Sequence, residues 1–323
     1  MKDRPFISIV IPVEKGTNLS LSFFENLKYP SSRFEIIVVE GGNPSFQRNR
    51  GVEKAEGEII CFLDKDSHPS SDYLEEVARS FNFGEENTPG AVGGPAIPLS
   101  SSHWMSILFS RTLTSFFPLL WMRSRYKRRG KIRVSDEKEL IGCNLCVRKE
   151  VFQKIGGFNE SLYPNEENEF LNRVKRKGYT ILYNPSLIVY RKMEDGLRKF
   201  LSRFYRYGQG RGKEIRVEGL CPNFVYFLPF FLLLYVFSLF LFHPWWYLFP
   251  LFLYISLGGF SALFYSWKER KIYLLSLFPL SFLVHLIYAL GMIKGVIANR
   301  GNTPKIWKAE VRKIKRFNDE ITL

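Results

Sequence analysis

Two carboxylates one residue apart, Asp64 and Asp66, follow an apolar stretch of the chain. The stretch from Ile59 to Leu63 is β-prone and too short for a helix, so it predicts a buried strand. The carboxyl end of such a strand is where open α/β sheets bind ligands. Two oxygen ligands at that edge suit Mg²⁺ or Mn²⁺ better than zinc. Aspartate pairs of this kind are also common in solvated loops, so the segments around the pair decide whether it is interpreted as a metal site.

Strands and helices alternate through the first third of the chain, which predicts a parallel, doubly wound sheet. Segments 6–13 and 34–40 read as buried strands. Their carboxyl ends and that of the aspartate-bearing strand would meet in one crevice. We therefore expect Glu14, Glu40 and the aspartate pair, far apart in the sequence, to gather at one edge of the sheet.

The remaining elements follow from periodicity and from breaks at glycine and proline. We predict helices at 19–28, 47–55, 72–81 and 150–155, and short strands at 91–97, 140–147 and 178–185. Ser70 or Ser71 is expected to cap the 72–81 helix. A further helix begins at Glu166, where carboxylates are stabilised by the unpaired N–H groups of the first turn. An acidic first turn is usually only a cap, so Glu166 and Glu167 need support from their context.

The composition combines a basic balance with high hydrophobicity. The 323 residues carry a formal net charge of +15, with 46% hydrophobic and 16% aromatic residues. Basicity alone would allow a nucleic-acid partner, but the apolar residues concentrate after Cys221 and the basic residues flank them. This distribution favours a membrane and argues against nucleic acid. The polar start of the chain leads directly into a strand, so we expect no signal peptide and a cytosolic N-terminal domain.

Cysteine spacing offers little support for a zinc site. The four cysteines stand at positions 61, 143, 146 and 221. Cys143 and Cys146 have the spacing of half a zinc site, but no second pair of ligands stands at a matching distance. We expect these cysteines to pack in the core.

Two segments have the character of membrane-surface helices. Trp104 to Met122 is apolar with only Arg111 charged, and a basic run from Arg123 to Lys131 follows it. Its length would allow a span, but the residues after it complete the same site, so an interfacial helix on anionic headgroups is expected. An ordinary core helix is the alternative. Leu197 to Gly212 is a basic amphipathic helix that should also lie along the membrane surface.

Three hydrophobic segments, 223–243, 245–265 and 272–298, are each long enough to span a bilayer. His243 and Pro244 separate the first two so tightly that a helical hairpin is expected, with Trp245 at the far headgroup level. The predicted organisation is therefore a cytosolic catalytic domain (1–194), amphipathic interfacial helices (195–222), a transmembrane region (223–298) and a basic tail (299–323).

The orientation of these segments contains a conflict. The basic loop at 266–271 favours the cytosolic side. Three simple spans would then send the basic tail to the outside. Either the tail crosses regardless, or the third segment dips into the membrane and returns. Gly291 and Gly295 could pack that segment closely against another helix, although one such glycine pair is a weak signal.

The chain resembles a family-2 glycosyltransferase of the GT-A fold over roughly residues 6–211. Matching pieces occur in order at Ser8 to Pro12, Glu35 to Gly42, Gln47 to Gly51, Phe62 to Asp66, Gly142 to Gly157 and Asn165 to Glu169. Tyr190, Arg191 and the 205–211 segment further resemble the membrane-bound exopolysaccharide and polyprenyl-phosphate glycosyltransferase branch. The resemblance implies a Rossmann-like mixed, mainly parallel sheet with helices on both faces, plus interfacial helices and C-terminal transmembrane helices.

The resemblance also implies roles for individual residues. Pro12, Val13, Glu14 and Glu40 would line the base and ribose of a nucleotide-sugar. Arg48 would face the nucleotide or its diphosphate. Asp64 would touch the ribose and the metal, and Asp66 would hold the metal.

On the acceptor side, Glu167 would be the catalytic base, with Glu166 beside it. Arg191, Arg203 and Arg211 would contact the acceptor or its phosphates. A simple headgroup anchor is an equal alternative for the helix that carries Arg203 and Arg211.

Several positions depart from the family pattern. Aspartate is usual where Glu40 and Glu167 stand, so each carboxylate reaches one methylene further. The usual aspartate-rich turn after the second strand is replaced by Gly41 to Ser45, and histidine is common where Arg191 stands.

The expected function is an inverting sugar transfer that uses Mg²⁺ or Mn²⁺. The donor would be a UDP- or GDP-linked sugar, and the acceptor a polyprenyl phosphate or lipid-linked glycan at the cytosolic face of the cell membrane, where a multi-pass chain is anchored. A processive polysaccharide synthase is one alternative, but Gln209 to Arg211 is not the Gln-x-x-Arg-Trp motif of those enzymes. A catalytically silent membrane scaffold is another, since two aspartates are exchanged for glutamate.

Overall fold

The structure is a computed structural model that describes residues 4–83, 89–194, 196–219, 224–242, 244–298 and 307–314. It divides into two compact units, which we call the sheet unit and the helical unit. The sheet unit comprises Met1–Leu99, Ser124–Lys192 and Asn302–Leu323, and the helical unit comprises Ser100–Arg123 and Met193–Gly301. By this division residues 100–123 belong with the apolar helices, and the described part of the tail, residues 307–314, belongs with the sheet.

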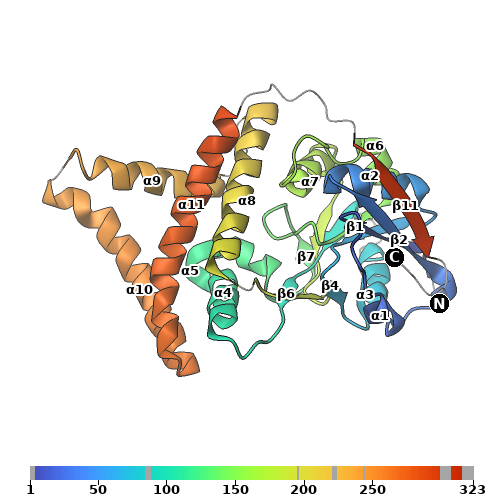
Figure 1. Cartoon of the computed structure of the whole chain (residues 1–323), viewed down its shortest axis with the longest axis horizontal. Helices are drawn as coiled ribbons and strands as arrows, with labels where there is room; N and C mark the ends of the chain where they lie inside the picture. Colours follow the sequence, from blue (N-terminus) through green and yellow to red (C-terminus); the bar gives the residue numbers. More distant parts are fainter. Residues whose placement is uncertain are drawn as a thin grey trace. The chain divides into compact units, whose positions relative to one another are not determined.

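An eight-stranded sheet forms the sheet unit, in the order β11-β2-β1-β3-β8-β5-β9-β7. Figure 1 shows its edge strand β11 in red beside β2. Its strands are β1 (Ile7–Val13), β2 (Phe34–Gly41), β3 (Ile59–Leu63), β5 (Ala91–Gly93), β7 (Arg133–Val134), β8 (Asn144–Arg148), β9 (Ile181–Tyr183) and β11 (Ala309–Ile314). β1 pairs in parallel with β2 and β3, whereas β8 is antiparallel to both β3 and β5. The prediction of a mixed sheet is confirmed, but parallel pairs do not dominate: β5 pairs in parallel with β9, whereas β11 and β7 are antiparallel to β2 and β9.

Helices cover both faces of this sheet. They are α1 (Ser22–Glu25), η1 (Ser31–Arg33), α2 (Pro44–Lys54), α3 (Tyr73–Phe81), α6 (Lys149–Ile155) and α7 (Glu166–Arg176). Successive residues of a strand point to opposite faces, so Ile9 packs in the core on the α3 side and Val10 packs in the core on the α2 side. Because both faces are buried, β1 reads as a continuous apolar run.

Two local predictions were wrong. The helix expected over 19–28 is only the four residues of α1, Ser22–Glu25. The helix α3 begins at Tyr73 after Asp72, and neither Ser70 nor Ser71 caps it through its side chain. Ser70 instead donates its backbone N–H to the carbonyl of Ile188 and accepts from the N–H of Tyr73, so its backbone forms the turn that starts the helix.

A small second sheet joins β4 (Ser67–Pro69), β10 (Val189–Arg191) and β6 (Ala96–Pro98). β4 follows the aspartate pair directly, and its register sets Arg191 opposite Ser67. This pairing brings the end of β10 next to the end of β3, although the two segments are more than 120 residues apart.

The helical unit combines apolar helices with one charged helix, α8 (Leu197–Glu218). The apolar helices are α4 (Trp104–Thr114), α5 (Phe116–Leu119), α9 (Leu228–Ser238), α10 (Phe249–Glu269) and α11 (Leu277–Ile297), with the short turns η2 (Leu120–Arg125), η3 (Phe224–Phe227), η4 (Trp245–Leu248) and η5 (Ile272–Ser276). By length and composition, Trp245–Glu269 and Ile272–Ile297 could each cross a membrane, whereas Phe224–Ser238 is shorter. Within this unit α8 runs beside α11, and α9, α10 and α11 form three sides of a triangle (Figure 1).

Four glycines let α8 and α11 approach until their backbones touch. A Cβ added to Gly208 would lie 2.1 Å from the carbonyl oxygen of Tyr288, and one added to Gly212 would lie 2.2 Å from that of Met292. The contact is reciprocal, because Gly291 and Gly295 of α11 face carbonyl oxygens of α8 at 2.2 Å. Two small-xxx-small patterns therefore interlock, in the way that close helix pairs require.

Gly208→Ala should destabilise the helical unit, because the added methyl group would collide with backbone that cannot rotate away. We expect a loss of about 2–3 kcal/mol in the free energy of unfolding, within the range of overpacked cores. Thermal unfolding of the detergent-solubilised full-length protein measures it. Gly259→Ala is the matched control, since a Cβ at Gly259 in α10 meets nothing within 4 Å. Equal melting temperatures for the two variants would contradict this description of the interface.

Candidate active site

The aspartate pair lies at the carboxyl end of β3 and is held by two arginines. Arg48 of α2 is buried and donates through Nη2 to Oδ1 of Asp64 at 2.8 Å. Arg191 of β10 donates through Nη2 to both carboxylate oxygens of Asp66, at 2.6 and 2.8 Å, and its Nη1 lies 3.4 Å from Asp64 Oδ2. Asp66 is 44% exposed and Asp64 29% exposed, so the pair opens to solvent on one side.

The acidic start of α7 joins the same network. Arg48 donates through Nη1 to Oε1 of Glu166 at 2.5 Å, which makes one guanidinium the bridge between Asp64 and Glu166. Burial opposes the charge on Arg48, but the fields of Glu166, Asp64 and Glu167 together raise its pKa. The predicted residues from α2, β3 and α7 thus come together around one buried cation.

Glu166 and Glu167 differ in their surroundings. Glu166 is buried, and its Oε2 has no hydrogen-bond partner among the described residues. Burial raises the pKa of Glu166 to about 7, with Arg48 lowering it and Glu167 raising it further. Glu167 is less buried and packs against Gly142, where an added Cβ would lie 3.4 Å from its side chain. Of the two carboxylates, Glu167 is therefore the one with the better access to solvent.

The residues predicted to line the nucleotide lie along the neighbouring strand ends. Pro12 and Val13 are buried in β1, whereas Glu14 is 83% exposed and lies 3.8 Å from Nζ of Lys65. Glu40, at the end of β2, is buried and lies 3.4 Å from Nη2 of Arg312 in β11. The predicted acidic edge exists, but Glu40 already has a cationic neighbour from the tail.

Three residues with structural importance at this edge had no predicted role. Gln47 donates through Nε2 to the carbonyls of Val13 and Val39, so it ties the ends of β1 and β2 together. Asn49 exchanges hydrogen bonds with the backbone of Phe158. Gln47 and Asn49 flank Arg48 in the motif on which the resemblance rests, so their place in that motif could have indicated their importance. Arg312 had no comparable signal in the sequence.

Residues 59–294 match the model of the family described as Glycosyl transferase family group 2. The chain belongs to this family. The matched residues include the aspartate pair, the start of α7 and most of the helical unit.

Relatives of this family-2 glycosyltransferase are distant in sequence. One is a probable glycosyltransferase, YdaM, of Bacillus subtilis (strain 168), 23% identical over 283 residues; the match covers 72% of this chain and 64% of that protein. Another is the dolichyl N-acetyl-alpha-D-glucosaminyl phosphate 3-beta-D-2,3-diacetamido-2,3-dideoxy-beta-D-glucuronosyltransferase of Methanococcus voltae, 21% identical, with 92% of this chain and 98% of that protein covered.

Among solved structures, the mannosyltransferase PcManGT from Pyrobaculum calidifontis, in complex with GDP-Man and Mn²⁺, matches with a TM-score of 0.54. The sequences are 14% identical, and the alignment covers 92% of this chain and 88% of that chain. The likeness supports the GT-A fold predicted for this family-2 member.

The two acceptor-side arginines of α8 belong to the helical unit and have partners there. Arg211 is 3% exposed, donates to Glu214 at 2.5 Å and lies over the Tyr226 ring at 3.6 Å. Arg203 donates to Glu194 at 2.6 Å. Their contact with acceptor phosphates stays a prediction, and these ion pairs give both residues a structural role in any case.

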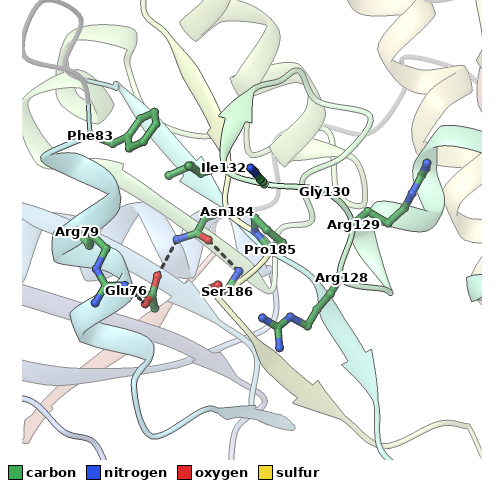
Figure 2. A pocket seen from close by; sticks show the side chains of 11 residues that line it. Glu76, Arg79, Phe83, Arg128, Arg129, Gly130, Ile132, Asn184, Pro185 and Ser186 are labelled. Atoms are coloured by element: carbon green, nitrogen blue, oxygen red, sulfur yellow. Dashed lines mark hydrogen bonds and ion pairs between the residues drawn. The ribbon is translucent and has the colours of Figure 1, made fainter.

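A separate cavity of about 410 Å³ lies elsewhere in the sheet unit (Figure 2). Four cationic side chains line it, those of Arg79, Arg128, Arg129 and Lys131. Figure 2 shows Asn184 between Glu76 and the backbone of Ser186, and Asn184 donates to Glu76 at 3.1 Å. The cavity contains none of the predicted catalytic residues, so this family-2 member carries its basic cavity apart from the carboxylate network.

The donor set of the carboxylate network fits a hard divalent ion completed by a substrate. No group of three or more potential protein ligands occurs among the described residues, but Mg²⁺ and Mn²⁺ are commonly held by one or two carboxylates together with substrate phosphates and water. Asp64 and Asp66 provide such a pair, and both are partly exposed.

Glu166→Gln should change how stability depends on pH. The folded protein keeps the Glu166 proton up to about pH 7, whereas an unfolded chain releases it near 4.5. The folded state therefore binds more protons between these values, and this carboxyl makes stability fall as the pH rises. The variant should gain stability relative to wild type from pH 5 to pH 7, by roughly 3 kcal/mol at most. Melting temperatures measured across this range test it, with Glu53→Gln on the exposed face of α2 as the control; a constant difference for Glu166→Gln would contradict the assignment.

Proposed function

We propose that this protein transfers a sugar, with inversion, from a nucleotide-sugar to a lipid-linked acceptor with the help of Mg²⁺ or Mn²⁺. The observation that carries the proposal is the continuous network Asp66–Arg191–Asp64–Arg48–Glu166 at the carboxyl edge of the sheet. The network supplies acidic groups for a metal, and Glu167, next to Glu166 in the first turn of α7, adds a carboxylate for a base where α/β sheets bind nucleotides. The PcManGT complex with GDP-Man and Mn²⁺ supports a nucleotide-sugar and a divalent ion for this fold.

In this proposal Glu167 accepts the proton of the acceptor hydroxyl as the hydroxyl attacks the anomeric carbon. The solvent access of Glu167 suits a base that must reach an incoming substrate. Glu166, buried beside Arg48, holds that arginine in place. Asp64 and Asp66 would hold the ion, which when bound neutralises the charge that builds on the leaving diphosphate. A single displacement with one base and no covalent intermediate gives inversion.

A lipid-linked acceptor is supported by the apolar surface of the helical unit and by the names of relatives. Large aromatic side chains such as those of Trp245, Phe249 and Phe252 are more than half exposed, which is unusual for a water-soluble surface. The Methanococcus voltae relative is named for a dolichyl phosphate-linked sugar substrate. A soluble donor and a lipid acceptor would meet at the cytosolic face of the cell membrane.

Arg191 should compete with the metal ion for Asp66, because both cations need the same carboxylate oxygens. Arg191→Gln should therefore tighten Mn²⁺ binding in the presence of a nucleoside diphosphate, by roughly tenfold or more on Coulomb grounds. Titration calorimetry of the full-length protein measures the dissociation constant. Arg50→Gln, which removes an exposed cation from α2, should leave it unchanged. Weaker Mn²⁺ binding by Arg191→Gln would show that Arg191 supports the ion instead of opposing it.

The proposal is tested by a thermal-shift screen with UDP, GDP and their sugars, with and without Mn²⁺, followed by transfer assays with the stabilising donor. We expect one nucleotide to raise the melting temperature only with the metal present, and its sugar to appear in a lipid extract. A silent scaffold would show neither metal-dependent stabilisation nor hydrolysis of any nucleotide-sugar.

A further inference from the structure

We infer that, among the described helices, the hairpin of α9 and α10 alone crosses the bilayer, and that α11 and the sheet unit are on the same side of the bilayer. The inference rests on the membrane attachment included in the proposed function, and it assigns a side to every loop of the helical unit. Three contacts within the two units carry it.

The first contact is the pairing of the tail with the sheet. β11 pairs antiparallel with β2 over six residues, from Ala309 opposite Gly41 to Ile314 opposite Ile36. Arg312 of β11 also lies 3.4 Å from Glu40, and Lys313 lies 2.9 Å from Glu56. Residues before and after the helical unit thus form one sheet, which cannot be divided by a bilayer. The chain between them must cross an even number of times.

The second set of contacts is made by α4 with the connection between α10 and α11, which we call the corner. Arg111 of α4 pairs with Glu269 at 2.7 Å and lies over the Tyr265 ring, and Trp104 packs edge-on to Tyr273 at 6.2 Å. The segment that carries α4 leaves the sheet unit at residue 99 and returns to it at residue 124. Its helix α4 has 11 residues, about 17 Å, too short to cross a core of about 30 Å. The corner that α4 contacts is therefore on the same side of the bilayer as the sheet unit.

The third contact runs along α11. The first half of α11 is covered by α5, where the Pro118 carbonyl lies 2.9 Å from Nε2 of His285. The second half is locked to α8 through the glycine interface of Gly208 and Gly212. α8 carries nine charged side chains, at positions 198, 199, 203, 206, 211, 213, 214, 216 and 218. A crossing α11 would pull these charges into hydrocarbon, which is strongly unfavourable.

The hairpin of α9 and α10 has the length and the exposed apolar side chains expected of a segment that inserts into a membrane. The turn of α9 continues through hydrogen bonds from Leu239 and Phe242 to the carbonyls of residues 235 and 238, so residues 224–242 span about 28 Å. The arm Trp245–Glu269 has 25 residues, about 37 Å. The side chains of Phe237, Phe240, Leu241, Trp245, Phe249, Phe252 and Phe260 are all more than half exposed.

Polar groups and charges agree with this orientation. Near the tip, the hydroxyl of Tyr235 donates to the carbonyl of Tyr247 at 2.6 Å, and Ser238 and Tyr247 share a hydrogen bond at 2.7 Å, so these groups are satisfied inside the hairpin. Trp245 and Trp246 stand at the tip, where aromatic residues favour the headgroup level. Lys268 and Arg270 flank the corner, on the side where basic loops are retained. The predicted conflict over the tail disappears when α11 does not cross.

Cysteine labelling of the full-length protein in sealed membranes tests the inference. Single thiols are placed in a Cys221→Ser background, in which the cysteines at 61, 143 and 146 are buried. The exposed positions are Glu53→Cys in the sheet unit, Trp246→Cys at the tip, Lys268→Cys at the corner and Glu310→Cys in the tail. A membrane-impermeant maleimide is applied to intact cells and to inside-out vesicles. Detergent-opened samples establish that each thiol reacts, and Trp245→Cys and Trp267→Cys provide second thiols for the tip and the corner.

We expect Glu53→Cys, Lys268→Cys and Glu310→Cys to be labelled in the same preparation, and Trp246→Cys only in the opposite one. Labelling of Lys268→Cys together with Trp246→Cys, or from the side opposite to Glu53→Cys, would overturn the inference, because that is the pattern of α10 and α11 as the spans. A tip thiol that reacts from neither side, or from the side of Glu53→Cys, would overturn it too. The readout needs no sugar donor, so its failure is distinct from a failure of the proposed transfer.

Discussion

Asp66→Asn should reduce sugar transfer by roughly 10³-fold or more, because a charge-stabilising group in the transition state is removed. Asp66 is the more exposed member of the aspartate pair, and its described partner is Arg191. The substitution keeps the shape of the side chain but removes the charge that a divalent ion needs. The initial rate of transfer from the donor identified by thermal shift, measured at saturating Mn²⁺, provides the test.

The control for this variant is Asp72→Asn, which removes an exposed, ion-paired aspartate at the start of α3. It should retain both transfer and melting temperature. The melting temperature of Asp66→Asn should change little, because Asp66 is 44% exposed and its partner Arg191 keeps a second carboxylate, Asp64, within 3.4 Å. Wild-type turnover by Asp66→Asn would rule out this carboxylate as a metal ligand.

Glu167→Gln should lower the turnover number by about 10²–10⁴-fold with a hydroxyl acceptor, the range typical of a lost general base. The amide keeps the packing against Gly142 but cannot take a proton. The dissociation constant of the donor should change by less than about threefold, because Glu167 acts on the acceptor. Steady-state kinetics together with donor binding separates the two effects.

Glu150→Gln provides the comparison for Glu167→Gln, since Glu150 is also an acidic residue in the first turn of a helix, α6, and is exposed. It should behave as wild type. Unchanged turnover by Glu167→Gln would have a specific meaning: a phosphate acceptor needs no base, so the acceptor would then be a polyprenyl phosphate and not a hydroxyl. Full activity with a proven hydroxyl acceptor would contradict the role given to Glu167.

The elements of the sheet could be predicted from the sequence because each is encoded locally. The apolar run of β3 ends at Asp64, and the apolar run of β2 ends near the glycines at 41 and 42. The edge strand β11 could not be predicted, because its six residues lie in a basic tail and are stabilised by pairing with β2, more than 250 residues away. The length of α1 was overestimated because its apolar residues contact the core without forming further helical turns.

The residues of the candidate site could be predicted from the sequence, but the ion pairs between them could not. The order of the motifs names Asp64, Asp66 and Glu167, whereas the bridging positions of Arg48 and Arg191 depend on distances that only the fold sets. The helical unit gives a parallel case. Gly291 and Gly295 signal close packing, but their partners are hidden in α8, whose charges indicate a surface helix.

The central claim is that Asp66 holds a divalent ion together with a nucleoside diphosphate. Electron paramagnetic resonance of free Mn²⁺, measured with the full-length protein in the presence and absence of GDP or UDP, tests this claim most directly. We expect one nucleoside diphosphate to increase Mn²⁺ uptake by the wild-type protein and to have no such effect on Asp66→Asn. Equal, nucleotide-dependent uptake by both proteins would contradict it.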